Sequence, residues 1–213
     1  MKKLFYSLMA IVALAVISAA CSSVSYTGIW QDKEKLAAKP YKTIFVSVLT
    51  SDIGARQTIE TDLANALTAK GFKVEKSSDH FNPKAAVKEI SEADFMTKIK
   101  SLGCDGILTS AVIDQKSEDR YVDGNVTYGS YPVVGRYGRF WSYREYRYPV
   151  YDPGYYTNDK TYFLEDNFYD VESGGILFSM QSQAVNPNDL ESFSKDYSKA
   201  MIKELEINNI VRK

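Results

Sequence analysis

Four carboxylates in the last third of the sequence are the residues best suited to acid–base chemistry. They lie in and beside a run with strand-like composition and are Glu165, Asp166, Asp170 and Glu172. Two carboxylates held about one strand-pair apart can act as general acid and general base, as in a hydrolase. Solvated strand faces and a turn explain the same residues more simply. We therefore expect no enzymatic activity and keep a hydrolase that uses these hairpin carboxylates as the second alternative.

Histidine and cysteine offer little further chemistry. His80 is the sole histidine and lies in a stretch of loop composition, so a serine–histidine–aspartate triad rests on sequence proximity alone. Cys104 stands at the expected start of a strand, where a small apolar side chain packs well, and we interpret it as buried. The sequence has no Cys-x-x-Cys and no histidine pair, so neither a metal nor a cofactor is expected.

The segment from 120 to 160 has the composition of a binding surface. It holds ten of the 16 tyrosines and five of the seven arginines, and its glycines and prolines indicate a long inserted loop. Aromatic rings beside guanidinium groups are enriched where proteins bind partners, and they also stack on sugars. The same rings can instead pack the loop onto its own domain. The candidate binding residues are Arg139, Trp141, Tyr143, Arg144, Tyr146, Arg147 and Tyr148.

The residues before this insertion predict alternating strands and helices. Residues 43–49 are apolar on both faces, which is typical of a central strand. The elements that follow are a helix capped at Ser51 or Asp52 and stopped at Gly71, a strand from Phe72, a helix from Ser91 with Asp94 as its capping partner, and a strand at 107–113. Strands joined through helices of this length pair in parallel with right-handed crossovers.

The residues after the insertion predict a hairpin and a last helix. Two strand-like runs, 162–171 and 176–185, flank a serine–glycine–glycine turn. An amphipathic helix then opens at Pro187 and Asn188. The predicted fold is α/β (α+β), with a mixed sheet of about five strands, helices packed on it, and the long Tyr-rich insertion at 120–160.

The N-terminus has the order of a cleavable export signal. Lys2 and Lys3 precede a mostly apolar run from Leu4 to Ile17, which is shorter than the roughly 17 to 25 residues of a membrane-spanning helix. Removal of residues 1–20 takes the formal charge from −1 to −3, which disfavours nucleic acid as a partner. We divide the chain into a signal peptide (1–20), an N-terminal tether (21–40) and one domain (41–213).

The stretch Ser18-Ala19-Ala20-Cys21 resembles a bacterial lipobox, with serine where lipoboxes usually carry an aliphatic residue. The resemblance implies that Cys21 becomes the new N-terminus and carries fatty acyl chains such as palmitate. Ordinary cleavage after Ala20 is the alternative. Ser22 and Ser23 lack the aspartate retention signal of inner-membrane lipoproteins, so the resemblance favours the outer membrane.

Several stretches together resemble small bacterial outer-membrane lipoproteins of a family that carries no assigned activity. They are the lipobox, 42–49, 103–108, 162–183 and the terminal helix, and Phe178 stands where relatives tend to have tryptophan. More distantly, the order of elements is similar to the periplasmic α/β domains of the curli secretion channel and of the TolB N-terminus. These resemblances imply a binding or assembly module, with no catalytic residue to carry over.

The expected protein is therefore a non-enzymatic outer-membrane lipoprotein. Acyl chains on Cys21 hold it to the membrane, and the domain faces the periplasm and contacts another envelope component, expected to be a protein. The alternative is a glycan-binding or polysaccharide-binding module that uses the Tyr/Trp/Arg-rich loop.

Overall fold

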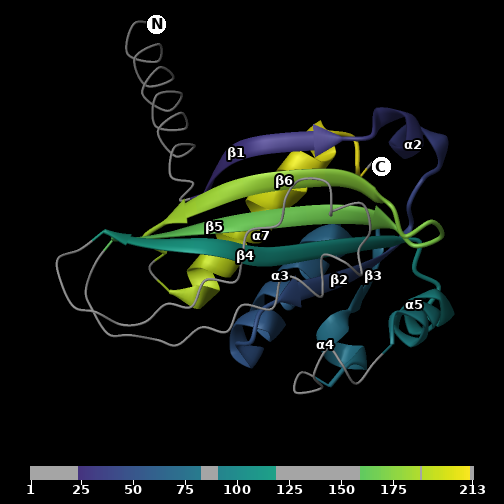
Figure 1. Cartoon of the computed structure of the whole chain (residues 1–213), viewed down its shortest axis with the longest axis horizontal. Coiled ribbons are helices and arrows are strands. Elements are labelled where there is room, and N and C mark those ends of the chain that lie inside the picture. Colours follow the sequence, from purple (N-terminus) through teal and green to yellow (C-terminus); the bar gives the residue numbers. More distant parts are fainter. Residues whose placement is uncertain (1–23, 83–90, 119–158, 188, 212–213) are drawn as a thin grey trace, which may run out of the picture.

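One mixed β-sheet organises the computed structural model, which describes residues 24–82, 91–118, 159–187 and 189–211. Its strands are β1 (Val24–Gln31), β2 (Thr43–Leu49), β3 (Lys73–Lys76), β4 (Gly106–Glu118), β5 (Asp159–Asp170) and β6 (Ile176–Val185). The helices are α2 (Lys33–Ala38), α3 (Ile53–Ala69), α4 (Ser77–His80), α5 (Glu92–Ser101) and α7 (Leu190–Ile207). The strand order is β1-β6-β5-β4-β2-β3, with α3 and α7 packed together against the sheet (Figure 1). The predicted fold class is confirmed, and the described sheet has six strands where about five were expected.

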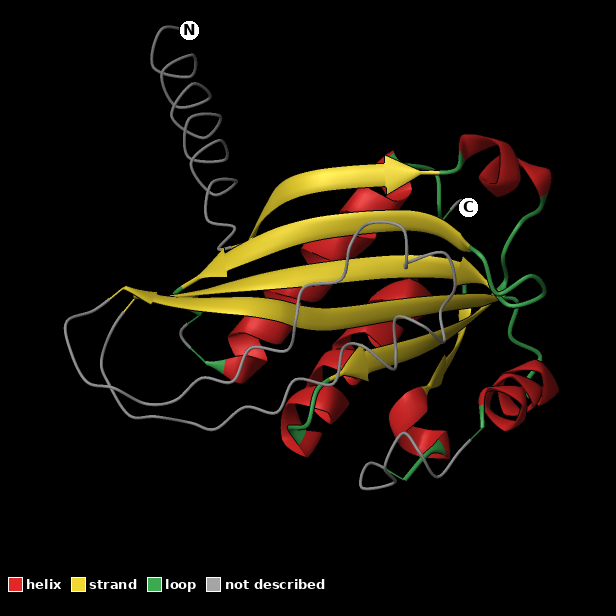
Figure 2. Cartoon of the chain, viewed as in Figure 1, coloured by secondary structure: helices red, strands yellow, loops and turns green. Residues whose placement is uncertain are grey.

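Strand β2 is apolar on both faces because both faces are buried. Ile44, Val46 and Val48 contribute to a core cluster shared with α3 and α7. Phe45 and Leu49 contribute to a second cluster shared with α5. Strand β2 pairs in parallel with β3 and with β4, as the sequence predicted. Helices therefore cover both faces of this half of the sheet (Figure 2).

The predicted helix boundaries before the insertion are confirmed by their caps. The Asp52 side chain accepts a hydrogen bond from the Ala55 backbone N–H at 3.0 Å and begins α3. Gly71 ends this helix with a φ of 93°, a left-handed conformation that favours glycine. The Ser91 hydroxyl accepts from the Asp94 backbone N–H at 3.1 Å and begins α5.

The predicted hairpin and last helix are also present. Strands β5 and β6 pair antiparallel, and Gly174 in the turn has a φ of 66°. Helix α7 begins at Asp189, whose carboxylate accepts from the Ser192 backbone N–H at 2.8 Å, one residue later than the predicted start at Asn188. This helix packs Tyr197, Met201 and Leu205 against the sheet.

The predicted tether 21–40 requires a correction, because residues 24–40 belong to the domain. Strand β1 pairs antiparallel with β6 along its length, and α2 follows it directly. Val24 is buried and Tyr26 packs against the core cluster beside α7. Residues 27–30 are exposed on both faces of the strand, so this stretch lacks the alternation that identifies a half-buried strand.

Candidate functional site

Two of the predicted sites lie outside the described residues. They are Cys21 and the candidate binding residues between Arg139 and Tyr148. Lipidation at the first and partner or glycan binding at the second therefore stay predictions. The hairpin carboxylates, His80 and Cys104 lie within the described residues.

The four hairpin carboxylates do not form one cluster. Glu165 and Asp166 are consecutive on β5 and therefore point to opposite faces of the sheet. Asp166 and Asp170 share a face, but four residues of strand separate them by about 13 Å. The Glu172 side chain is 87% exposed beyond the end of the strand. Asp170 and Glu172 are the pair that the hairpin brings near each other, because Lys39 Nζ lies 2.5 Å from the first and 3.7 Å from the second.

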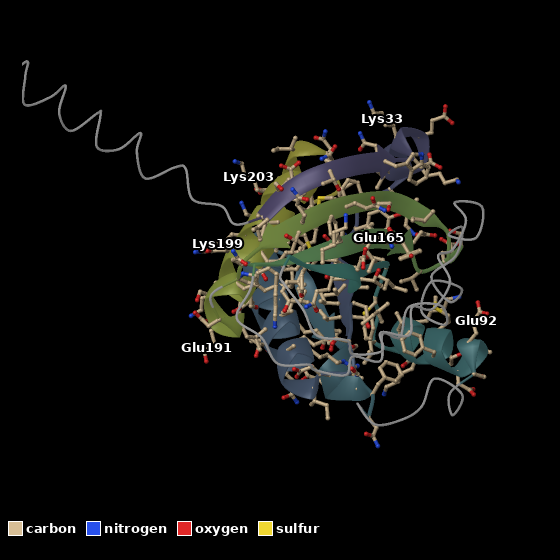
Figure 3. All side chains as sticks on the ribbon, turned by 60° about the vertical axis from the view of Figure 1, so that its left-hand side comes forward. Lys33, Glu92, Glu165, Glu191, Lys199 and Lys203 are labelled. Carbon is tan, nitrogen blue, oxygen red and sulfur yellow. The ribbon has the colours of Figure 1, made fainter. Side chains whose placement is uncertain are left out.

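Glu165 accepts hydrogen bonds from two side-chain amides. Its carboxylate accepts from Gln181 Nε2 at 3.0 Å and from Asn167 Nδ2 at 3.3 Å. Figure 3 shows Glu165 among the strands, whereas Glu191, Lys199 and Lys203 project outward from α7. These contacts tie β5 to β6 on the face opposite α7.

Asp170 fastens the hairpin turn to the chain entering β2. Lys39 Nζ lies 2.5 Å from its Oδ1, and the Ser173 backbone N–H and hydroxyl both donate to Oδ2 at 2.8 Å. Burial acts to raise the pKa of Asp170, but the hydrogen bonds from Lys39 and Ser173 outweigh it and hold the pKa below its usual value. Asp170 is therefore a structural anion.

Asp166 is fully buried between the sheet and α7. The Tyr197 hydroxyl donates to Asp166 Oδ1, and Ser110 Oγ lies 2.5 Å from the same hydroxyl. Among the described residues, Asp166 Oδ2 has no hydrogen-bond partner. Burial, with a smaller contribution from the charge of Glu165, raises the pKa of Asp166 to about 7 against the hydrogen bonds from Tyr197 and Ser110. The group therefore exchanges its proton near neutral pH inside a packed interface.

The carboxyl end of β2 is where open α/β sheets often bind ligands, because the strand order reverses there. Here Glu60 of α3, fully buried, fills that position. Its carboxylate accepts from the Val48 N–H at 3.0 Å, the Ser78 N–H at 2.8 Å and the Ser77 hydroxyl at 2.5 Å. Arg56 Nε lies 3.3 Å away with a side chain only 14% exposed. The network joins α3, β2 and α4.

His80 and Cys104 have structural surroundings. His80 Nε2 lies 2.8 Å from Glu75 Oε2, while Ser77 is committed to Glu60, so these contacts place no serine on the imidazole. Cys104 is buried as predicted, and burial raises the pKa of its thiol to about 12. Within the described ranges, no three histidine, cysteine or acidic side chains are grouped to hold a metal ion.

One edge of the sheet, formed by strand β1, exposes apolar side chains. We call residues 25–31, on the side of β1 that pairs with no other described strand, the β1 edge. None of these residues is charged, and Ile29 and Trp30 are 44% and 51% exposed. They lie on opposite faces, because Ile29 is opposite Met180 and Trp30 is opposite Ser179 of β6.

The other edge of the sheet has a different character. Strand β3 has only four residues, and Lys73, Glu75 and Lys76 carry charge. Short, lysine-bearing edge strands prevent unwanted pairing between sheets. The β1 edge has neither feature. Sequence reasoning missed this edge, and the features that could have identified it are the isolated Trp30 and the absence of charged residues from Val24–Gln31.

In the part of the chain that the structure describes, no helix is long and apolar enough to cross a membrane.

No family model and no curated protein sequence matches the chain. Among solved structures, it is similar to the PelC dodecamer from Paraburkholderia phytofirmans, with 14% identity over 84% of this chain and 95% of that chain and a TM-score of 0.42. It is similar to lipoprotein GNA1162 from Neisseria meningitidis, with 13% identity over 78% of this chain and 99% of that chain and a TM-score of 0.41. A PDZ domain protein from Parabacteroides distasonis ATCC 8503 matches at 13% identity and a TM-score of 0.41 over 90% of this chain and 38% of that chain. A bacterial lipoprotein is thus among the solved proteins to which this chain is similar.

Proposed function

We propose that this protein is a non-enzymatic lipoprotein of the outer membrane, anchored through Cys21, whose periplasmic domain is an assembly module. In this proposal the domain binds another envelope component through the β1 edge. The supporting observation is that this edge is long, uncharged and exposed, with Ile29 and Trp30 on its two faces.

An edge strand presents a row of unpaired backbone N–H and C=O groups that another strand can complete. The β1 edge offers residues 25–31 for such pairing, whereas β3 at the other edge has only four residues. Burial of its exposed apolar side chains against a partner would add hydrophobic free energy to that of the backbone hydrogen bonds. An open edge of this kind is an aggregation hazard unless a partner covers it, which is the physical argument for a binding role.

The non-enzymatic part of the proposal is supported by how the buried acids are used. Glu60 and Asp170 are engaged by cationic or backbone donors, and Asp166 is enclosed beneath α7. Catalytic acids need a partner positioned across a space that substrate can enter. The arrangement of these three acids fits stabilisation of the fold.

Photocrosslinking in cells tests the binding edge. A photoreactive phenylalanine analogue at Thr27, which is exposed on β1, is expected to give a discrete crosslinked product in the envelope fraction. The matched control places the same probe at Lys73 on β3, whose side chain is 64% exposed. Equal labelling from both positions, or no product from Thr27, would refute the binding role of the β1 edge.

Replacement of Cys21 with alanine tests the anchor. Because two or three acyl chains at roughly 0.8 kcal/mol per buried methylene hold a protein firmly, their loss is expected to release the chain into the soluble fraction or to leave it as uncleaved precursor. Membrane fractionation with intact-mass measurement distinguishes these states. A variant that stays membrane-bound with a trimmed N-terminus would show that Cys21 is not the anchor.

A further inference from the structure

We infer that the domain lies directly on the membrane surface, with one end of its sheet in contact with the lipid headgroups. At this end β1 begins, β6 ends and α7 begins, and we call it the membrane pole, marked by Val24, Val185 and Leu190 (Figure 1). The inference rests on the proposed function, because it takes Cys21 as the lipid anchor and adds the surface of the domain that touches the bilayer.

The short spacer between anchor and fold sets how far the domain can lie from the lipid. Only Ser22 and Ser23 separate Cys21 from Val24, the first residue of β1. A fully extended chain spans at most about 3.6 Å per residue, so Val24 lies within about 11 Å of the acylated cysteine. Acyl chains hold that cysteine at the boundary of the hydrocarbon, and the headgroup layer beyond it is roughly 5 to 8 Å thick. Strand β1 therefore begins at or just above the headgroups.

The membrane pole exposes apolar side chains on both sides of the sheet. Val24 is opposite Ala184, and the next residue of β6, Val185, is 45% exposed. Ala184 packs in the core cluster beside α7, so Val185 points to the other face. Leu190, in the first turn of α7, is 38% exposed. Apolar side chains that enter the boundary between headgroups and acyl chains strengthen attachment to a membrane.

Charged side chains of both signs accompany these apolar residues. Lys160 lies at the membrane pole because its backbone N–H donates to Asn186 Oδ1 at 2.7 Å, and Asp189 and Glu191 stand at the start of α7. Electrostatic attraction to anionic lipid would require a cluster of cations. The anchor and the apolar side chains therefore carry the contact, and vesicles of neutral lipid are expected to support it.

Contact through the membrane pole leaves the β1 edge accessible to a partner. Trp30 is six residues from Val24, about 20 Å further along β1. A domain that lay instead with the β1 edge on the bilayer would press unpaired backbone groups against lipid, which cannot satisfy them. The membrane pole is therefore the favoured contact.

Quenchers carried by lipids test this orientation. The full-length, lipidated Val185→Cys variant is labelled with a thiol-reactive fluorophore and incorporated into phosphatidylcholine vesicles that contain phosphatidylcholine spin-labelled at its headgroup. Because the label would lie among the headgroups, its fluorescence is expected to fall at least about twofold relative to vesicles without spin label. Cys104 is buried and the sulfur of Cys21 carries lipid in this proposal, so the wild-type chain gives the background.

Three further cysteine variants complete the comparison. Leu190→Cys is a second site at the membrane pole and is expected to be quenched like Val185→Cys. Glu172→Cys, 87% exposed, follows Asp170, which lies nine residues from Thr161 of the Val185 pair, about 30 Å along β5. Ile29→Cys lies on the β1 edge. Both of these are expected to stay near background. Equal quenching at all sites, or stronger quenching at Ile29→Cys than at Val185→Cys, would overturn the inference.

A longer spacer tests the distance argument by itself. A flexible Gly/Ser linker of about 20 residues inserted between Ser23 and Val24 has an r.m.s. length of about 25 Å, enough to let the domain leave the surface. Quenching at Val185→Cys is then expected to fall to the level of Glu172→Cys. Unchanged quenching would show that the short spacer does not hold the domain at the membrane and would overturn the inference.

The inference and the proposed function fail in different ways. Protein that floats with the vesicles but is quenched at neither Val185→Cys nor Leu190→Cys keeps its anchor and refutes the membrane pole alone. A chain that carries no lipid and does not float with the vesicles refutes the anchor, and the inference falls with it. The binding role of the β1 edge is decided separately by the probe at Thr27.

Discussion

Replacement of Glu60 with alanine is expected to lower the free energy of unfolding by about 3 to 5 kcal/mol. The substitution leaves the backbone N–H groups of Val48 and Ser78 without their hydrogen-bond acceptor. It also leaves the guanidinium of Arg56, whose side chain is only 14% exposed, without its carboxylate partner. Breaking a buried pair from one side costs far more than the net energy of the pair, because the remaining charge stays desolvated. Urea unfolding of the purified protein measures the loss.

The Lys70–Glu206 ion pair provides the control for Glu60. Its two charged groups lie 2.6 Å apart, but both side chains are more than a third exposed. Surface pairs of this kind contribute about 0 to 1 kcal/mol, so Glu206→Ala is expected to change stability little. If Glu60→Ala costs no more than Glu206→Ala, the Glu60 network does not hold α3 to β2 and α4 as described.

The wild-type chain is expected to lose about 4 kcal/mol of stability relative to Asp166→Asn as the pH rises from about 4 to 8. Burial raises the pKa of Asp166 to about 7 in the folded chain, against 3.8 for the free side chain. Between these values the folded state keeps a proton that the unfolded state has lost, so the stabilisation is complete below pH 3.8 and disappears as the pH passes 7. Asparagine cannot ionise and still accepts the Tyr197 hydroxyl.

Unfolding curves of both proteins across this pH range measure the difference, and the comparison cancels the contribution of titrating groups that do not interact with Asp166. Glu172→Gln is the control, because that carboxylate belongs to the same hairpin and is 87% exposed. Its stability is expected to follow the wild-type curve. A difference between wild type and Asp166→Asn that stays constant with pH would show that Asp166 keeps an ordinary pKa in the folded chain.

The regular elements of the core could be read from local patterns. Residues 43–49 form a doubly buried strand because apolar side chains occur on both of its faces, with Ser47 as a buried polar exception. The caps at Asp52 and Ser91 were visible because capping depends on residues three positions apart. The strand at 162–171 was likewise predicted from its composition, and its alternation places Glu165 and Asp166 on opposite faces in the structure.

The roles of the buried acids could not be read in the same way. Nothing near Glu60 in sequence shows that the Val48 N–H and the Ser78 N–H converge on it, since one donor precedes it by 12 residues and the other follows it by 18. The pairing of Asp166 with Tyr197 joins residues 31 positions apart. Such contacts follow from how α3 and α7 pack on the sheet, which local propensity does not specify.

The sequence by itself determined the parallel and antiparallel halves of the sheet and the order of the strands and longer helices after residue 41, whereas the short helix α4 was expected to be a loop. Only the tertiary structure decided that residues 24–31 are a sheet edge, which of the acids are enclosed, and that the ligand position at the end of β2 is filled by Glu60. The reason is that the spacing of apolar residues in a sequence indicates which face of a strand or helix is buried against the rest of the chain. An edge strand that is exposed on both faces therefore shows no such spacing. The role of a buried acid depends on hydrogen-bond donors from segments that are distant in the sequence.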